Sequence, residues 1–165
     1  MKVLLAVLLL AASQGPEQGV VLQTTVAAKP DEDILGDCHY EITIPNPAKP
    51  IRAVWVIFDR GRDMLRYCGD SEVQALAYRK DLALLLPFHC RAKTYEDMDV
   101  DPSKGIGRAL FAALDQLAKS SGRPELASAK LILMSFSGGG SLAARLTAFA
   151  ARSHDRGHSR QPQPV

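Results

Sequence analysis

The sequence predicts an α/β fold, in which strands alternate with helices and form a parallel sheet flanked by those helices. The first observation is a set of short apolar runs, which are typical of strands buried on both faces. These runs lie at residues 53–58, 84–88 and 130–134. The second observation is that the segments between them carry apolar side chains at helical spacing. With 165 residues, 47% of them hydrophobic, the chain suits one ordinary globular domain.

The elements follow in order along the chain. A half-buried strand is predicted at residues 39–45, where apolar and polar side chains alternate, and the prolines that follow enforce a loop. Helices are predicted at residues 70–83, 105–120 and 139–149. Asp70 or Ser71 caps the first helix, and Gly122 ends the second. Each helix stands between or after buried strands, as strand–helix–strand units require.

The two ends of the chain differ from this pattern. Residues 1–14 combine a short apolar run with small residues after it, which predicts a signal peptide and a secreted or periplasmic protein. Residues 15–37 are polar and predict a flexible tether, and residues 38–150 form the predicted α/β domain. Residues 151–165 are rich in Arg, Ser, Gln and Pro and predict a disordered tail. No segment is long and apolar enough to predict a transmembrane anchor.

Three cysteines are expected to form one disulfide and leave one thiol in an oxidising compartment. Their wide spacing contains no CxxC element and argues against a zinc site. Cys68 with Cys90 is the favoured pair, because both flank one predicted helix–strand unit, although connectivity does not follow from sequence. Cys38 is then the remaining thiol.

Charge and acidic motifs exclude several partners. The formal net charge of +2 gives no reason to expect nucleic acid. Alternating aspartates at residues 97–101 resemble the start of a calcium loop, but Gly and Glu do not follow at the required spacing. The sequence therefore predicts no metal and no cofactor.

Chemistry is concentrated after the last buried strand, in Ser135-Phe136-Ser137-Gly138-Gly139. A strand, a sharp glycine-rich turn and a helix are the context of a nucleophile elbow, whose usual pattern is G-x-S-x-G. Ser137 is the candidate nucleophile, and Ser135 replaces the first glycine with another small residue. The backbone N–H of Gly138 would stabilise an oxyanion. A plain tight turn and a phosphate-binding nest stay open as alternatives.

With this motif, residues 38–150 resemble the α/β-hydrolase family, in particular exported bacterial esterases and polyester depolymerases. The resemblance implies an incomplete α/β-hydrolase-type sheet that ends after the elbow helix. It also implies a small-molecule or polymeric ester as substrate. In the family, a loop after an early strand supplies the second oxyanion-hole amide, which falls here on Gly61 or Arg62. Asp59 and Arg60, beside them, fit a surface ion pair equally well.

The resemblance also implies a missing acid and base, which follow the serine in the family. Ser137, Asp155 and His158 can be written as a triad, but the tail gives no rigid element to hold a base. His39 and His89 precede the serine. The abrupt change of composition near residue 150 favours a frameshift or premature stop, so little or no turnover is expected. The alternative function is an exported, non-catalytic α/β binding module.

Overall fold

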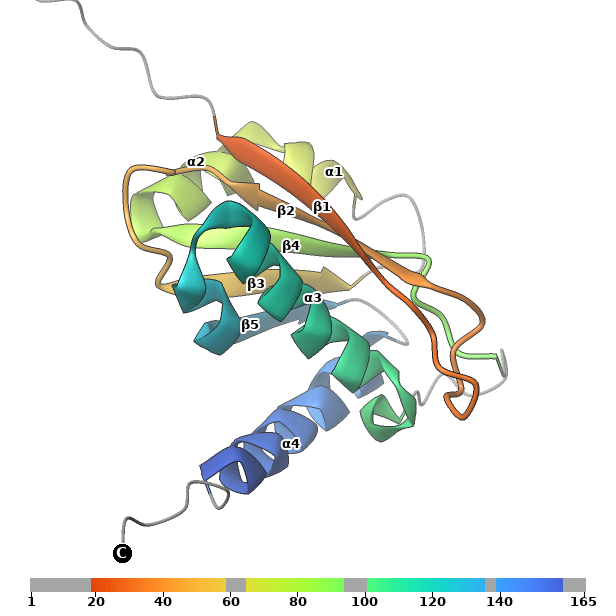
Figure 1. Ribbon diagram of the computed structural model, residues 1–165. Coiled ribbons are helices and arrows are strands. Elements are labelled where there is room, and N and C mark those ends of the chain that lie inside the picture. Colours follow the sequence, from red (N-terminus) through yellow and green to blue (C-terminus); the bar gives the residue numbers. More distant parts are fainter. Residues whose placement is uncertain (1–18, 59–64, 94–100, 136–138, 159–165) are drawn as a thin grey trace, which may run out of the picture.

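The computed structural model describes residues 19–58, 65–93, 101–135 and 139–158. Its centre is a five-stranded sheet in the order β1-β2-β4-β3-β5, with helices on both faces (Figure 1). The sheet confirms the predicted α/β class. The predicted signal peptide, residues 1–14, lies outside the described residues and stays a prediction. Within the described part of the chain, no helix has the length and hydropathy to cross a membrane.

The parallel half of the sheet follows the apolar runs in the sequence. β3 (Ala53–Phe58) lies between β4 (Leu82–Phe88) and β5 (Lys130–Ser135) and is parallel to both. Val54, Val56 and Ile57 are fully buried, because helices cover both faces of this central strand. β4 begins two residues earlier than predicted, since α2 ends at Lys80.

The other half of the sheet is antiparallel, which the strand–helix pattern does not predict. β1 (Val20–Val26) pairs with β2 (Cys38–Ile44), and β2 pairs with β4, both in antiparallel register. β1 occupies part of the segment predicted as a flexible tether at residues 15–37, so that prediction is wrong for residues 20–26. Val20 and Val21 are exposed, while Val26 is buried. β1 pairs with β2 along its whole length, and its valine and threonine residues favour a strand.

The helices divide between the two faces of the sheet. α1 (Leu65–Gly69) and α2 (Ser71–Lys80) cover one face, where Cys68 and Ala77 pack with Ile57, Leu84 and Leu86. α3 (Ile106–Ser121) covers the other face and buries its apolar stripe against β2, β3 and β4. Short 3₁₀ helices at Pro102–Lys104 and Pro124–Ser128 flank α3. Figure 1 shows α3 in front of the sheet and α2 behind it.

The predicted helix ends are confirmed by their caps. The carboxylate of Asp70 accepts hydrogen bonds from the backbone N–H groups of Glu72 and Val73 at 2.9 and 3.0 Å. α3 ends at Gly122, which takes the left-handed conformation with φ 68°. A residue with a side chain would adopt this conformation less readily.

α4 (Gly139–His158) is longer than the helix predicted at residues 139–149. It includes residues 151–158 of the predicted disordered tail, which is a correction for that part of the chain. Alanine and arginine favour a helix, and no proline interrupts the sequence before Pro162. Leu142 and Leu146 attach the helix to the core shared by α3 and the sheet.

Gly107 allows α3 and α4 to approach each other. A Cβ built on Gly107 would lie 2.5 Å from a ring carbon of Phe149 and 2.7 Å from the carbonyl oxygen of Pro102. Phe149 also stacks on Phe111, with ring centroids 6.3 Å apart. We expect Gly107→Ala to lower the free energy of unfolding by about 1–3 kcal/mol, because the added methyl group overpacks this contact. Urea titration followed by circular dichroism measures the change.

Gly140→Ala is the matched control, because nothing lies within 4 Å of a Cβ at Gly140. It should leave the free energy of unfolding unchanged or slightly raised, as alanine favours a helix. Equal stability of the two variants would show that α4 does not pack closely against α3 at Gly107.

One disulfide and one buried thiol are present, as predicted, but the pairing differs from the favoured one. Cys38 bonds to Cys90, whereas Cys68 is free and buried. The favoured Cys68–Cys90 pair is wrong, because Cys68 lies under α2 on the opposite face of the sheet from Cys38. Burial raises the pKa of the Cys68 thiol to about 11, so this group has little thiolate at neutral pH.

Candidate functional site

The sheet has a topological switch at the carboxyl ends of β3 and β5. These strands are parallel neighbours, and the register places Phe58 beside Ser135 at their ends. The chain after β3 leads to α1 on one face of the sheet, and the chain after β5 leads to α4 on the other face. Connections that diverge in this way open a crevice, where ligands bind in open α/β sheets. The carboxyl ends of β3 and β5 are therefore the expected place for a ligand site in this fold.

Both connections that carry the predicted site residues start at this edge. Ser137 and Gly138 belong to residues 136–138, between the last residue of β5 and the first residue of α4. Gly61 and Arg62 belong to residues 59–64, between β3 and α1. All four residues lie outside the described part of the chain. The structure thus gives the strand and helix on either side of each connection and leaves the roles of these four residues as predictions.

The described helix after the connection is held firmly at its start. Leu142 is 9% exposed and Leu146 is fully buried, so the first turns of α4 pack against α3 and the sheet. A strand, a connection of three residues and a core-packed helix are the elements that a nucleophile elbow needs on its two sides.

The histidines downstream of Ser137 are not brought back to this edge. Residues 154 and 158 belong to the continuous helix α4, which Figure 1 shows running away from the sheet. At a rise of about 1.5 Å per residue, the backbone of residue 158 lies about 28 Å along the axis from the start of α4. A general base must lie within about 3 Å of the serine hydroxyl. The triad of Ser137, Asp155 and His158 involves a serine outside the described residues and stays untested, while the backbone of residues 155 and 158 continues along α4.

His39 and His89 do lie at the relevant edge of the sheet, but on other strands. His39 follows the first residue of β2, and His89 follows the last residue of β4. β4 is separated from β5 by β3, which corresponds to about 10 Å at the usual strand spacing. Neither histidine is thus on a strand next to the one that leads to Ser137. The structure assigns no base to the serine among the described residues.

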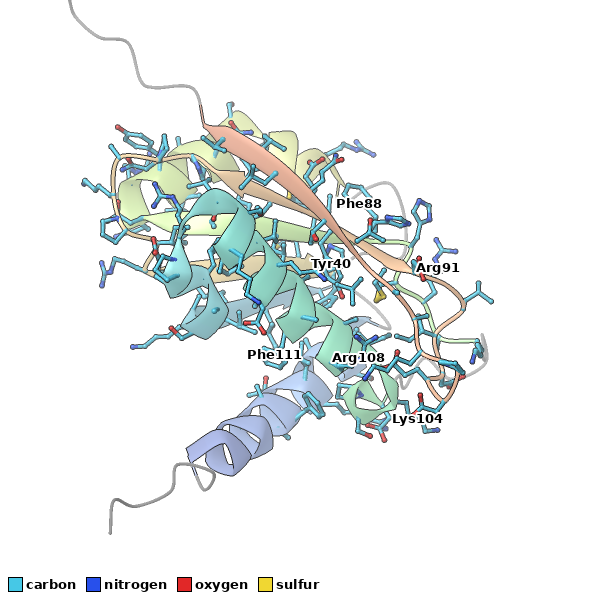
Figure 2. The ribbon with its side chains drawn as sticks, viewed as in Figure 1. Tyr40, Phe88, Arg91, Lys104, Arg108 and Phe111 are labelled. Atoms are coloured by element: carbon cyan, nitrogen blue, oxygen red, sulfur yellow. A yellow bond between two sulfur atoms is a disulfide. The ribbon has the colours of Figure 1, made fainter. Side chains whose placement is uncertain are left out.

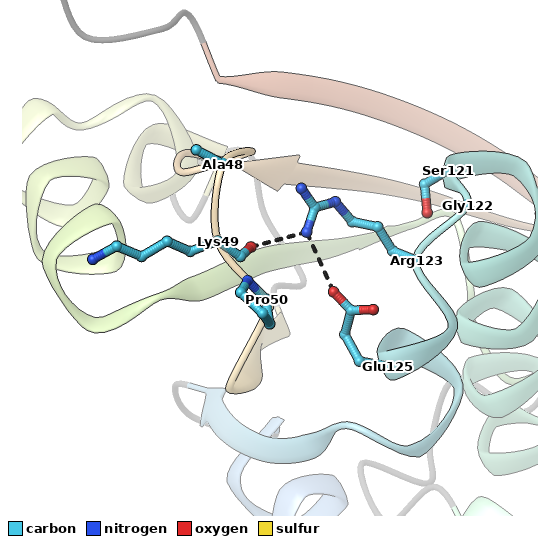
Figure 3. Close-up of a pocket in the computed structure, with 7 residues that line it drawn as sticks. All are labelled: Ala48, Lys49, Pro50, Ser121, Gly122, Arg123 and Glu125. Atoms are coloured by element: carbon cyan, nitrogen blue, oxygen red, sulfur yellow. Dashed lines mark hydrogen bonds and ion pairs between the residues drawn. The ribbon is translucent and has the colours of Figure 1, made fainter.

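A shallow pocket of about 400 Å³ lies at the opposite end of the sheet. It is lined by Ala48, Lys49, Pro50, Ser121, Gly122, Arg123 and Glu125. Figure 3 shows the guanidinium of Arg123 directed at the Lys49 carbonyl oxygen and at the Glu125 carboxylate, 2.9 and 3.2 Å away. It also donates to the carbonyl oxygen of Pro47. Arg123 thus links the two loops that line the pocket. Because its guanidinium is already paired with these groups, it is poorly placed to bind an anion.

A charged pair that the sequence does not predict fixes the loop between β1 and β2. Arg108 of α3 donates through Nε and Nη2 to the two carboxylate oxygens of Glu32, which is 8% exposed. Figure 2 shows Arg108 reaching toward this loop. Glu32 belongs to the predicted tether at residues 15–37, where no periodicity indicates a buried residue. Among the residues that the structure describes, no group of three or more His, Cys, Asp or Glu side chains is arranged to hold a metal.

Comparison with known proteins finds similar solved structures but no related sequence. No family model matches the chain, and no curated protein matches its sequence. Among solved structures, a thermostable esterase from Pseudomonas putida matches 90% of this chain with a TM-score of 0.49 and 15% identity. FphF, a fluorophosphonate-binding serine hydrolase of Staphylococcus aureus, matches 74% with a TM-score of 0.43 and 11% identity.

The chain spans 42% of the esterase and 49% of FphF. The mixed five-stranded sheet with helices on both faces fits the incomplete α/β-hydrolase fold that the sequence predicts.

Proposed function

We propose that this chain is an exported part of a serine hydrolase that cleaves small-molecule or polymeric esters, with Ser137 as its nucleophile. The observation that supports the proposal is the position of residues 136–138. They join β5 to the core-packed helix α4 at the switch point of the sheet, beside the end of β3. A strand, a connection of three residues and a helix at this place are what a nucleophile elbow requires on its two sides. Export is supported by the apolar run and small residues within residues 1–14.

In the proposed reaction, Ser137 Oγ attacks the carbonyl carbon of the ester, and the carbonyl π electrons move to the oxygen. The backbone N–H of Gly138 and that of Gly61 or Arg62 donate to this oxyanion. The tetrahedral intermediate then expels the alkoxide, which takes up the proton that the serine lost and leaves as the alcohol. Water hydrolyses the remaining acyl-serine to the carboxylic acid and regenerates Ser137. No described residue is placed to accept the serine proton, so this proton passes to solvent water, a weak base. We therefore expect ester turnover to be low in this chain alone.

A fluorophosphonate probe tests the nucleophile without requiring turnover. Trypsin releases residues 131–145 as one peptide, which contains Ser135, Ser137 and Ser141. We expect at least tenfold more label on Ser137 than on either neighbour, because only Ser137 is proposed to face an oxyanion hole. Mass spectrometric fragmentation of that peptide gives all three amounts from one sample, so the neighbouring serines act as internal controls.

Ser137→Ala should abolish labelling of the peptide, whereas Ser135→Ala and Ser141→Ala should leave label on Ser137. Denaturation in urea before addition of the probe should remove the preference for Ser137. Equal labelling of the three serines, or none in the folded protein, would contradict the proposal and favour a non-catalytic binding module.

A further inference from the structure

Two exposed histidines are held next to each other by the disulfide. Cys38 directly precedes His39, and Cys90 directly follows His89, so the bond between the cysteines fixes both histidine backbones. The imidazole rings are nearly perpendicular, with centroids 6.1 Å apart. The predicted fold gives these histidines no role, and the proposed ester cleavage does not use them.

The ring of His39 is oriented by a neighbouring strand. Thr25 of β1 pairs with His39 in the sheet, and its Oγ1 lies 2.8 Å from His39 Nδ1. A hydroxyl on one ring nitrogen leaves the other, Nε2, for a ligand. Such a hydrogen bond to the second nitrogen is the usual way in which proteins orient a metal-binding histidine.

His89 is fixed by its backbone. It has a φ of 54°, which is uncommon for a residue other than glycine. This left-handed conformation turns the chain at the end of β4, directly before Cys90. Backbone conformations of this kind are concentrated at binding and active sites, where the surrounding structure maintains them. Here the disulfide is the covalent part of that surrounding structure.

The separation of the rings is compatible with one shared cation. With zinc–nitrogen bonds of about 2.0–2.1 Å, two imidazoles on the same ion have centroids about 5–6.5 Å apart. The observed 6.1 Å is within this range. Both side chains are exposed, so an ion can reach them and water can complete its coordination.

We propose that His39 and His89 form a binding site for a divalent transition cation of the zinc class. Imidazole is a ligand that zinc, copper and nickel ions favour, whereas magnesium and calcium favour oxygen ligands. Two protein ligands give an exchangeable surface site, in contrast to the closed sites of three or four ligands that hold structural zinc. The site does not depend on the proposed hydrolase activity.

The test is a titration of the full chain with zinc chloride, measured by isothermal titration calorimetry. We expect one saturable site, and at least a tenfold loss of affinity in His39→Ala and in His89→Ala. The chain contains two further histidines, so His154→Ala/His158→Ala is the matched control and should bind zinc as the unchanged chain does. Thr25→Val should weaken binding several-fold, since Thr25 orients a ligand and does not touch the ion.

A second measurement needs no variant. Substoichiometric nickel chloride should broaden the ring proton resonances of His39 and His89 in the NMR spectrum and leave those of His154 and His158 sharp. Magnesium chloride should broaden none of them. The proposal is overturned if zinc does not bind, if the loss occurs in the control variant, or if nickel broadens all four histidines equally.

Discussion

Cys38→Ser/Cys90→Ser is expected to lower the free energy of unfolding by about 4 kcal/mol. This is the free-energy equivalent of the chain entropy that a disulfide closing a loop of this size removes from the unfolded state. The two cysteines are 52 residues apart in the sequence. The bond also ties the start of β2 to the segment that follows β4, and the Tyr40 hydroxyl contacts Cys90 Sγ at 3.6 Å. Urea unfolding monitored by tryptophan fluorescence measures the loss, because the chain has a single tryptophan.

The reducing agent dithiothreitol provides the control for this experiment. It should destabilise the unchanged chain by a similar amount and have no further effect on Cys38→Ser/Cys90→Ser. Cys68→Ala should keep its sensitivity to the reducing agent, because Cys68 is free. The Cys38–Cys90 pairing would be disproved if dithiothreitol did not lower the stability of the unchanged chain, and the unchanged chain, Cys68→Ala and Cys38→Ser/Cys90→Ser all unfolded alike with and without it.

Arg108→Ala is expected to lower the free energy of unfolding by about 2–3 kcal/mol, because it leaves the Glu32 carboxylate buried without its partner. The Glu32 side chain is 9% exposed and that of Arg108 is 31% exposed. The partial exposure of Arg108 places the expected loss below that of a fully buried pair. Arg108 also donates to the carbonyl oxygen of Ala27 at 2.9 Å, so its removal frees the loop between β1 and β2. Urea titration measures the effect.

Lys119→Ala is a suitable control, because Lys119 lies on the exposed side of the same helix and should change stability little. A double-mutant cycle with Glu32→Gln should show coupling between Glu32 and Arg108. Additive effects in that cycle would contradict the proposed pairing.

The pair should also make stability depend on acid. The hydrogen bond from Arg108 lowers the pKa of Glu32 below its ordinary value of 4.5, and burial opposes this effect. A lowered folded pKa gives stability that is present above the unfolded pKa and is lost as the pH falls through the folded pKa. We therefore expect Glu32→Gln to reduce the loss of stability below about pH 4.5. A pH series of urea titrations on both proteins checks this.

The local sequence was sufficient for the central elements. The apolar runs of β3 and β4 and the stripe of α3 lie at positions that the structure buries, so periodicity finds them. The run of β5 also forms a strand, but it lies at the edge of the described sheet with Ile132 exposed, so the expectation that this strand is buried is wrong. Asp70 and Gly122 mark helix ends for equally local reasons, since each satisfies or accommodates the backbone at its own position. The placement of residues 136–138 after a buried strand and before a helix follows from the same patterns.

The missed elements depend on partners far away in the sequence. β1 forms against β2 and lies within residues 15–37, which are interpreted as a tether because small and polar residues surround it, although Val20–Val26 itself favours a strand. Glu32 is buried because Arg108, on a helix predicted without reference to it, reaches the same loop. The Cys38–Cys90 pair requires β2 and β4 to be neighbours, although they are separated by β3 and two helices in the chain.

The sequence by itself determined the α/β class, the buried strands β3 and β4 and the helix ends, because each follows from local periodicity or a short motif. Ser137 as the nucleophile stays a prediction. Only the tertiary structure decided the antiparallel pairing of β1 and β2, the partner of Cys90 and the proximity of His39 to His89. These features come from contacts between residues that are distant in sequence. Such contacts stabilise the folded chain, but they produce no periodic pattern in the local sequence of either partner.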